Sequence, residues 1–264
     1  MDNGLALRLG QAVRAADPDR YFSSLFAPVQ HRPYLYALYA FNHEITHVAE
    51  SVREPMVGAI RLEWWRETVE QAAKGVPRPH DVARGLASLF EKREVRPASL
   101  NAIIAAREFD SSSEFFSGFA ALEDYLDATG GALMRLAAEL LDSDPRITRE
   151  AALAYGLAGL MRSLPFHNRR RKLYLPLDLL RQEGLTPDEF FVLEKDSSIE
   201  KVVQRVRAHA WDHFQAARQV RPHTALPAIL PAALVPNYLR QIGKEVPIHR
   251  RQIALLGAFM RRKL

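Results

Sequence analysis

The chain has 264 residues, 48% of them hydrophobic and 25% charged, and this ordinary globular composition argues against an intrinsically disordered protein. Its 36 Lys and Arg residues against 31 Asp and Glu give a net charge of +5, which permits attraction to phosphates or an anionic membrane without identifying either. The absence of cysteine excludes disulfides and thiolate metal sites, and it fits a reducing compartment.

The N-terminal residues contain no basic segment followed by an apolar core, so the sequence predicts no secretory signal. No apolar run approaches the roughly 18–20 residues that a membrane-spanning helix needs. We therefore expect a protein that is soluble or bound peripherally to a membrane.

Leucine, alanine and charged residues recur at helical spacing along most of the chain, whereas alternating runs of Val, Ile and Thr are scarce. The sequence therefore predicts an all-α protein. The Pro/Gly breaks are short, which favours one continuous domain over residues 1–264. The first helix is expected to stop at Asp17-Pro18. In chain order, the expected helices cover residues 3–15, 33–52, 56–74, 80–94, 97–109, 115–141, 147–164 and 197–220.

Several local signals predict where helices begin. Ser111 and Ser197 each precede a glutamate by three residues, and this capping-box spacing predicts helix starts near both serines. The run Thr186-Pro-Asp-Glu189 predicts another start, because a capping threonine precedes proline at the first helical position and two acids. Prolines are expected to cut the later apolar segment into short pieces at Pro222, Pro227, Pro231 and Pro236.

The C-terminal residues 252–260 combine an apolar face with basic flanks, Arg250-Arg251 and Arg261-Arg262-Lys263. The favoured interpretation is a core helix with solvated ends. The alternative is an amphipathic helix that lies on an anionic membrane surface.

The stretch from Gly156 to Asp178 begins as a small-residue helix, which is expected to break at Pro165 because proline lacks an amide donor. Four cationic side chains, residues 169–172, follow it. The pattern is typical of the floor and lip of a pocket for an anionic or amphipathic molecule, although a solvated surface loop explains it equally well. No nucleic-acid-binding motif accompanies the cluster, so nucleic acid is not an expected partner.

The run His43-Glu44-Ile-Thr-His47 matches H-E-x-x-H, in which two histidines one helical turn apart hold zinc and the glutamate acts as a base. A third ligand is missing from the pattern, since Glu63 and Glu67 can be proposed only by their distance along the chain. Surface histidines on a helix are the simpler interpretation.

Three segments, in order, resemble the squalene/phytoene synthase family. Leu38-Tyr-Ala-Phe-Asn-His43 resembles the entry to that family's first aspartate-rich helix, and Tyr125-Leu-Asp-Ala-Thr-Gly-Gly-Ala132 resembles its middle helix. Lys172-Leu-Tyr-Leu-Pro176 resembles the Arg-(Ile/Val)-Tyr-Leu-Pro sequence after the second aspartate-rich helix. The resemblance implies an all-helical isoprenoid-synthase-like bundle with a central cavity.

The resemblance also implies a metal site that this sequence has lost. In the family, two aspartate-rich motifs hold Mg²⁺, a hard cation that prefers carboxylate oxygens and stabilises the departing diphosphate. The first motif falls on residues that include Thr46 and His47 and keeps one carboxylate, Glu50. The second falls on Ser163 to His167 and keeps none. We therefore expect prenyl-diphosphate condensation to be lost, with no catalytic residue and no cofactor at these positions.

Three further segments, residues 40–44, 61–65 and 167–178, resemble most closely a branch of the family that keeps the fold without the aspartates. That branch acts in the assembly of respiratory complex I, NADH:ubiquinone oxidoreductase. The expected partners are then nascent complex I subunits or assembly intermediates. The expected location is the cytoplasm or the inner face of the inner membrane, which is the matrix side in a mitochondrion.

If the cavity binds a ligand, an isoprenoid or another amphipathic anion is expected, and its contacts would be Arg162, Arg169, Arg170 and Lys172, with Tyr174 nearby. The alternative is that the basic residues at the mouth of the cavity are inherited from the family, although the ligand is no longer bound.

Two other functions stay open at this point. One is an active prenyl-diphosphate transferase that uses Mg²⁺ with an altered metal site. The other is a transition-metal site on His43, His47 and His167, because two of these histidines replace aspartates of the family motifs and neutral imidazole suits such metals.

Overall fold

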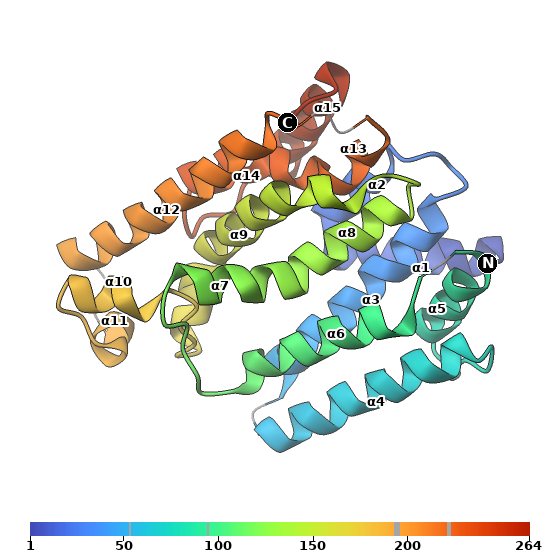
Figure 1. The fold of residues 1–264 in the computed structure, drawn as a ribbon, viewed down its shortest axis with the longest axis horizontal. Helices are drawn as coiled ribbons and strands as arrows, with labels where there is room; N and C mark the ends of the chain where they lie inside the picture. Colours follow the sequence, from blue (N-terminus) through green and yellow to red (C-terminus); the bar gives the residue numbers. More distant parts are fainter. Residues whose placement is uncertain (53, 94, 193–195, 221–222) are drawn as a thin grey trace. The chain divides into compact units, whose positions relative to one another are not determined.

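A computed structural model describes residues 1–264 except 53, 94, 193–195 and 221–222, and the described residues form helices and loops without a strand (Figure 1). The all-α prediction is therefore confirmed. The chain divides into two compact units, which we describe separately. Unit 1 comprises residues 1–113, 132–146 and 223–228, and unit 2 comprises residues 114–131, 147–222 and 229–264.

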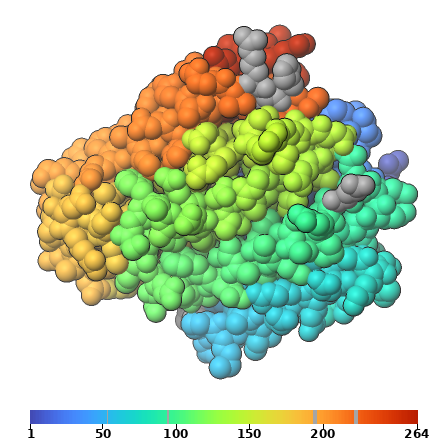
Figure 2. Space-filling view, in the orientation of Figure 1, coloured from blue at the N-terminus to red at the C-terminus, as the bar shows by residue number. Residues whose placement is uncertain are grey.

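Unit 1 is built around α3, which contacts every other major helix of the unit. Its apolar side chains recur every three or four residues, and Leu35, Leu38 and Phe41 are fully buried. Figure 2 shows α4 at the surface of this unit beside α6. The unit contains α1 (Asn3–Ala16), α2 (Pro18–Ser24), α3 (Arg32–Ser51), α4 (Pro55–Ala73), α5 (Asp81–Lys92), α6 (Pro97–Arg107), η1 (Glu108–Ser111), α8 (Ala132–Glu139) and η4 (His223–Ala225).

Unit 2 is built around the pair α9 and α12, the most extensive helix contact among the described residues. Buried α12 side chains from Val202 to Phe214 recur every four residues and lie against the alanine-rich face of α9. The unit contains α7 (Phe119–Leu126), η2 (Asp127–Gly131), α9 (Arg149–Arg169), α10 (Leu177–Gln182), α11 (Pro187–Val192), α12 (Ser197–Ala217), η5 (Leu230–Leu234), α14 (Val235–Arg240) and α15 (Ile248–Arg261). Two short elements, η3 (Pro145–Thr148) and α13 (Leu226–Ile229), run across the unit boundaries.

Most expected helices are present with ends that differ by a few residues. The capping box at Thr186 is confirmed, because the Thr186 amide donates to Glu189 Oε2 at 2.8 Å and the Glu189 amide donates to Thr186 Oγ1 at 3.2 Å. The start near Ser197 is also confirmed, although the capping side chain is Asp196, which accepts from the Ser198 amide at 2.7 Å. The proline-rich segment consists of short helical pieces as expected, and Pro222 lies outside the described residues.

One predicted boundary is confirmed near the N-terminus, and one is wrong in the middle of the chain. Asp17-Pro18 ends the first helix but also begins α2, since Asp17 accepts a hydrogen bond from the Arg20 amide at 3.1 Å. No helix starts near Ser111, and α7 begins only at Phe119. Instead, the Leu177 amide donates to the Phe116 carbonyl at 2.8 Å, so a pairing distant in sequence overrides the local capping signal.

The predicted break at Pro165 is also wrong, because α9 continues through this residue to Arg169. A proline inside a helix costs roughly 3 kcal/mol. Here α9 is held by buried residues up to Met161, and its last turn closes with the Arg170 amide bonded to the Phe166 and His167 carbonyls. Tertiary packing therefore offsets the local penalty.

No described helix combines the length and the apolar character that crossing a membrane requires.

Gly85 provides a test of how tightly unit 1 is packed. A Cβ atom at Gly85 would lie 2.8 Å from Leu9 Cδ1 and 3.0 Å from Ala37 Cβ. We expect Gly85→Ala to lower the free energy of unfolding by about 1–3 kcal/mol, because overpacking outweighs the gain in helix propensity. The matched control is Gly159→Ala, where a Cβ would meet no atom within 4 Å. Urea denaturation in which both variants are equally stable would contradict the packing at Gly85.

Candidate functional site

The first degenerate motif occupies the last turns of α3. His47 and Glu50 are exposed there, and His47 Nδ1 lies 3.3 Å from Glu50 Oε2. The single carboxylate that the motif retains therefore faces the histidine that replaces a family aspartate. This arrangement does not fit a magnesium cluster, which needs several carboxylate oxygens.

A cavity of about 210 Å³ lies beside this motif, between α3, α4 and the loop before α5. Trp64 and Trp65 form much of its wall, with ring centroids 4.9 Å apart, and the Arg61 guanidinium donates to Ser51 Oγ at 2.8 Å. Among the described lining residues Glu44 is the one carboxylate. The cavity therefore combines an aromatic wall with one guanidinium and one carboxylate, and it lacks the set of carboxylates that a magnesium ion prefers.

The H-E-x-x-H histidines lie one turn apart on the exposed side of α3, with the rings of His43 and His47 stacked at 5.7 Å. Within the described part of unit 1, they belong to no group of three side chains that could hold a metal. The zinc-hydrolase pattern therefore lacks its third ligand there. His167 belongs to unit 2, so the three-histidine site stays a prediction.

Two polar atoms on α3 lack a hydrogen-bond partner among the described residues. They are Asn42 Oδ1 and Thr46 Oγ1, one helical turn apart, and both are shielded from solvent. Buried polar groups are nearly always paired, so these positions are suited to an ordered water or a polar ligand atom.

The second degenerate motif, Ser163 to His167, lies near the end of α9 in unit 2. The His167 ring contacts the Tyr174 ring, with ring centroids 4.7 Å apart. The ring centroids of Tyr174 and Tyr125 lie 6.1 Å apart. Unit 2 thus brings together the middle-helix segment and the segment after the second motif, which are far apart in sequence. An aromatic cluster takes the place of carboxylates here.

The predicted anion contacts spread along the second half of α9 and the loop after it. The Arg162 guanidinium lies over Tyr238 at 4.6 Å, and that of Arg170 lies over Phe166 at 5.5 Å. Arg169 is exposed and Lys172 is half-buried. Arg162 and Arg169 are separated by roughly 10 Å of helix. A single site formed by all these cations therefore stays a prediction.

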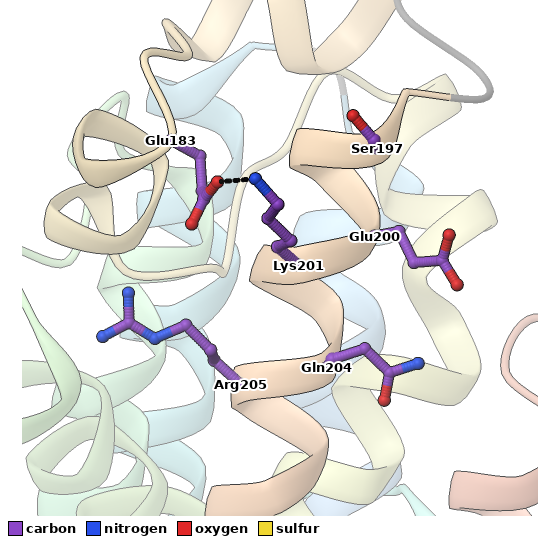
Figure 3. Close-up of a pocket in the computed structure, with 6 residues that line it drawn as sticks. All are labelled: Glu183, Ser197, Glu200, Lys201, Gln204 and Arg205. Carbon is purple, nitrogen blue, oxygen red and sulfur yellow. Dashed lines mark hydrogen bonds and ion pairs between the residues drawn. The ribbon is translucent and has the colours of Figure 1, made fainter.

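A further hollow of about 570 Å³ lies between α10 and α12 (Figure 3). Lys201 Nζ reaches Glu183 Oε2 at 3.0 Å, and Arg205 donates to Gln182 Oε1. Its cations therefore already have partners within the protein. The described residues that line it are Glu183, Ser197, Glu200, Lys201, Gln204 and Arg205.

The sequence analysis missed a cluster of two histidines and two acids in unit 2. His209 Nε2 lies 2.6 Å from Glu123 Oε1, and His213 Nδ1 lies 2.7 Å from Glu150 Oε2. The i, i+4 spacing of the histidines on α12 was the only signal within one segment, since the acids come from α7 and α9.

Charge within this cluster is balanced by close contacts. Burial raises the pKa of the Glu123 carboxyl, but the hydrogen bonds and charges of His209 and His213 outweigh it and leave the pKa below its ordinary value. At neutral pH the Glu123 side chain is therefore an ionised acceptor that faces both imidazoles.

Solved structures resemble this fold along nearly its whole length. A dehydrosqualene synthase matches with a TM-score of 0.84 and 14% identity, covering 98% of this chain and 96% of that one. A squalene synthase from Alicyclobacillus acidocaldarius matches with a TM-score of 0.75 and 17% identity, covering 98% and 94%. At these identities the likeness establishes the fold alone, which agrees with the expected isoprenoid-synthase-like helical architecture.

Sequence relatives fall into two groups. Human "NADH dehydrogenase (ubiquinone) complex I, assembly factor 6" is 28% identical over 241 residues, covering 89% of this chain and 72% of that protein. Presqualene diphosphate synthase from Rhodopseudomonas palustris is 26% identical over 207 residues, covering 76% of this chain and 73% of that protein.

The family comparison agrees with the motifs and the fold. The family model for squalene/phytoene synthase matches residues 13–255, which span most of both units. The chain therefore belongs to the squalene/phytoene synthase family.

Proposed function

We propose that this protein acts in the assembly of respiratory complex I and does not catalyse prenyl-diphosphate condensation. The observation that carries the proposal is the state of the metal motifs on a retained fold: Glu50 is the one carboxylate left, and it faces His47. The relatives named as complex I assembly factors, which align over 89% of the chain, support the same function.

The chemistry of the missing ligands explains why catalysis should be absent. Ionising a prenyl diphosphate needs Mg²⁺ to stabilise the departing diphosphate, and Mg²⁺ needs oxygen ligands. His47 and His167 stand at two of the motif positions, and neutral imidazole is a poor ligand for this hard cation. We therefore assign no cofactor to these positions.

The proposed partners are nascent complex I subunits or assembly intermediates. The proposed location is the cytoplasm of a bacterium or the matrix of a mitochondrion, at the inner face of the inner membrane. The whole chain, residues 1–264, would act as one domain, since the family model runs through both units. The central cavity and an amphipathic anion held by the α9 cations stay predictions.

The C-terminal helix supports a peripheral membrane location. One side of α15 is packed against the protein, with Leu255 and Ala258 buried. Its other side exposes Ile253, Leu256 and Met260, which are 67%, 50% and 74% exposed and lie on one face. The favoured sequence interpretation, a core helix, accounts for only half of this element. Its exposed face agrees better with the membrane alternative.

Basic residues surround that exposed apolar face. A pocket of about 350 Å³ beside it is lined in part by Arg240, Arg250 and Ile253, and residues 261–263 add three further cations. Guanidinium groups next to exposed apolar side chains suit an anionic lipid headgroup and the adjoining acyl region.

The absence of catalysis can be tested by pyrophosphate release. With farnesyl diphosphate and Mg²⁺, the purified protein should release no pyrophosphate above the blank, because one carboxylate cannot hold the metal cluster. The presqualene diphosphate synthase of Rhodopseudomonas palustris, assayed in parallel, is the positive control. Magnesium-dependent release that disappears in Glu50→Gln would establish the alternative, an active prenyltransferase.

The assembly function can be tested genetically in the source organism. Deleting the gene should reduce fully assembled complex I on native gels and leave other respiratory complexes unchanged. Both the wild type and Glu50→Gln should restore assembly, since the proposed function does not need the last motif carboxylate. An affinity-tagged wild type should also retain complex I subunits or intermediates from respiring cells. Normal complex I levels in the deletion strain would refute the proposal.

Membrane association can be tested with vesicles of phosphatidylcholine with and without phosphatidylglycerol. Leu256→Glu combined with Met260→Glu should weaken binding to the anionic vesicles about tenfold or more, because burying one leucine contributes roughly 1.5–3 kcal/mol. The control is Leu7→Glu, which changes a leucine on α1 that is 63% exposed, a fraction between those of Leu256 and Met260. Unchanged co-sedimentation of the double variant would exclude α15 as the membrane contact.

A further inference from the structure

Two helices of unit 2 bring three potential metal ligands to one point. Glu123 lies on α7, and His209 and His213 lie one turn apart on α12. One ligand atom from each of the three side chains lies within 4.8 Å of the other two. Among the described residues, no other group of three His, Asp or Glu side chains brings its ligand atoms within this distance of one another.

The two imidazoles converge on the same carboxylate oxygen. Glu123 Oε1 lies 2.6 Å from His209 Nε2 and 3.4 Å from His213 Nε2. Ligand atoms bound tetrahedrally to zinc, at about 2.0–2.1 Å from the ion, are roughly 3.3 Å apart. The His213 distance already fits this spacing, and the His209 ring needs to withdraw by less than 1 Å, relative to ideal zinc spacing.

Neighbouring side chains hold these ligands in place, as outer-shell groups do in metal sites. Glu150 Oε2 lies 2.7 Å from His213 Nδ1, so this carboxylate can accept a hydrogen bond from the Nδ1–H group. The Nε2 atom of His213 is then free to bind a metal. The Phe119 ring packs on the His209 ring at 4.0 Å. Arg149 lies 3.6 Å from Glu123 and 3.4 Å from Glu150, which limits the repulsion between the two acids.

We propose that Glu123, His209 and His213 bind one divalent transition-metal ion, with zinc as the preferred ion and Glu150 as the positioning group. Two imidazoles and one carboxylate are a common zinc ligand set, and they leave a fourth position for water. The three side chains are 13–28% exposed, so an ion has access from solvent without full solvation of the site. The bound ion would tie α7 to α12.

The site is separate from the degenerate motifs and from the proposed assembly function. Its ligands are residues 123, 209 and 213, none of which belongs to the first motif, residues 46–50, or to the second, residues 163–167. The competing explanation is a hydrogen-bonded network of the same four side chains that needs no ion. The two explanations differ in whether metal binds stoichiometrically.

The decisive experiment is a Zn²⁺ titration of the full chain after removal of metal with a chelator. At pH 7.5 we expect one Zn²⁺ per chain by calorimetry and a raised melting temperature, whereas Mg²⁺ should change neither. His209→Gln and His213→Gln should each abolish the stoichiometric binding. Glu150→Gln should weaken zinc affinity about 10–100-fold, as the loss of an outer-shell partner does elsewhere. Acidification should release the ion, because only neutral imidazole binds it.

The matched control is the double variant His43→Gln/His47→Gln, which removes the other i, i+4 histidine pair. It should keep the zinc affinity of the wild type. Far-ultraviolet circular dichroism of each metal-free variant verifies that it is folded. Lack of stoichiometric binding to the folded wild type, or affinity lost in the control and kept in His209→Gln, would overturn the proposal. Neither result would bear on complex I assembly, which is measured separately.

Discussion

The packing of α12 on α9 is the constraint on which unit 2 depends. Alanines on α9 let the α12 backbone approach closely, and α12 presents a buried side chain every four residues to that surface. The same contact places His213 beside Glu150. One packed helix pair thus supports both the second degenerate motif and the histidine–acid cluster.

The chain keeps the fold of its family without the aspartates of the family motifs. Helix packing depends on apolar side chains, so replacing metal-binding aspartates at the surface of α3 and α9 leaves the core of each unit intact. Two of the replacements have new contacts: His47 faces Glu50, and His167 lies against Tyr174. We propose that this scaffold binds other proteins at a membrane surface in place of a prenyl diphosphate.

Boundary errors in the sequence analysis share a cause. Ser111 and Pro165 are strong local signals, and the structure overrides both of them. Phe116 accepts a hydrogen bond from Leu177, and α9 continues past Pro165 with buried side chains up to Met161. At Thr186 the local capping box is formed in the structure, and the predicted helix start there is correct.

The all-α class, the family and the missing aspartates could be predicted from the amino-acid sequence, because periodicity and motif residues are local properties of the chain. The sequence also suggested residues that could contact an anion, but it could not show whether their side chains form one site. The cluster of Glu123, Glu150, His209 and His213 could not be predicted in this way, since these residues lie up to 90 positions apart in sequence and meet only when the helices pack. The tertiary structure likewise decided that α15 exposes one apolar face, because burial depends on which side of a helix its neighbours cover.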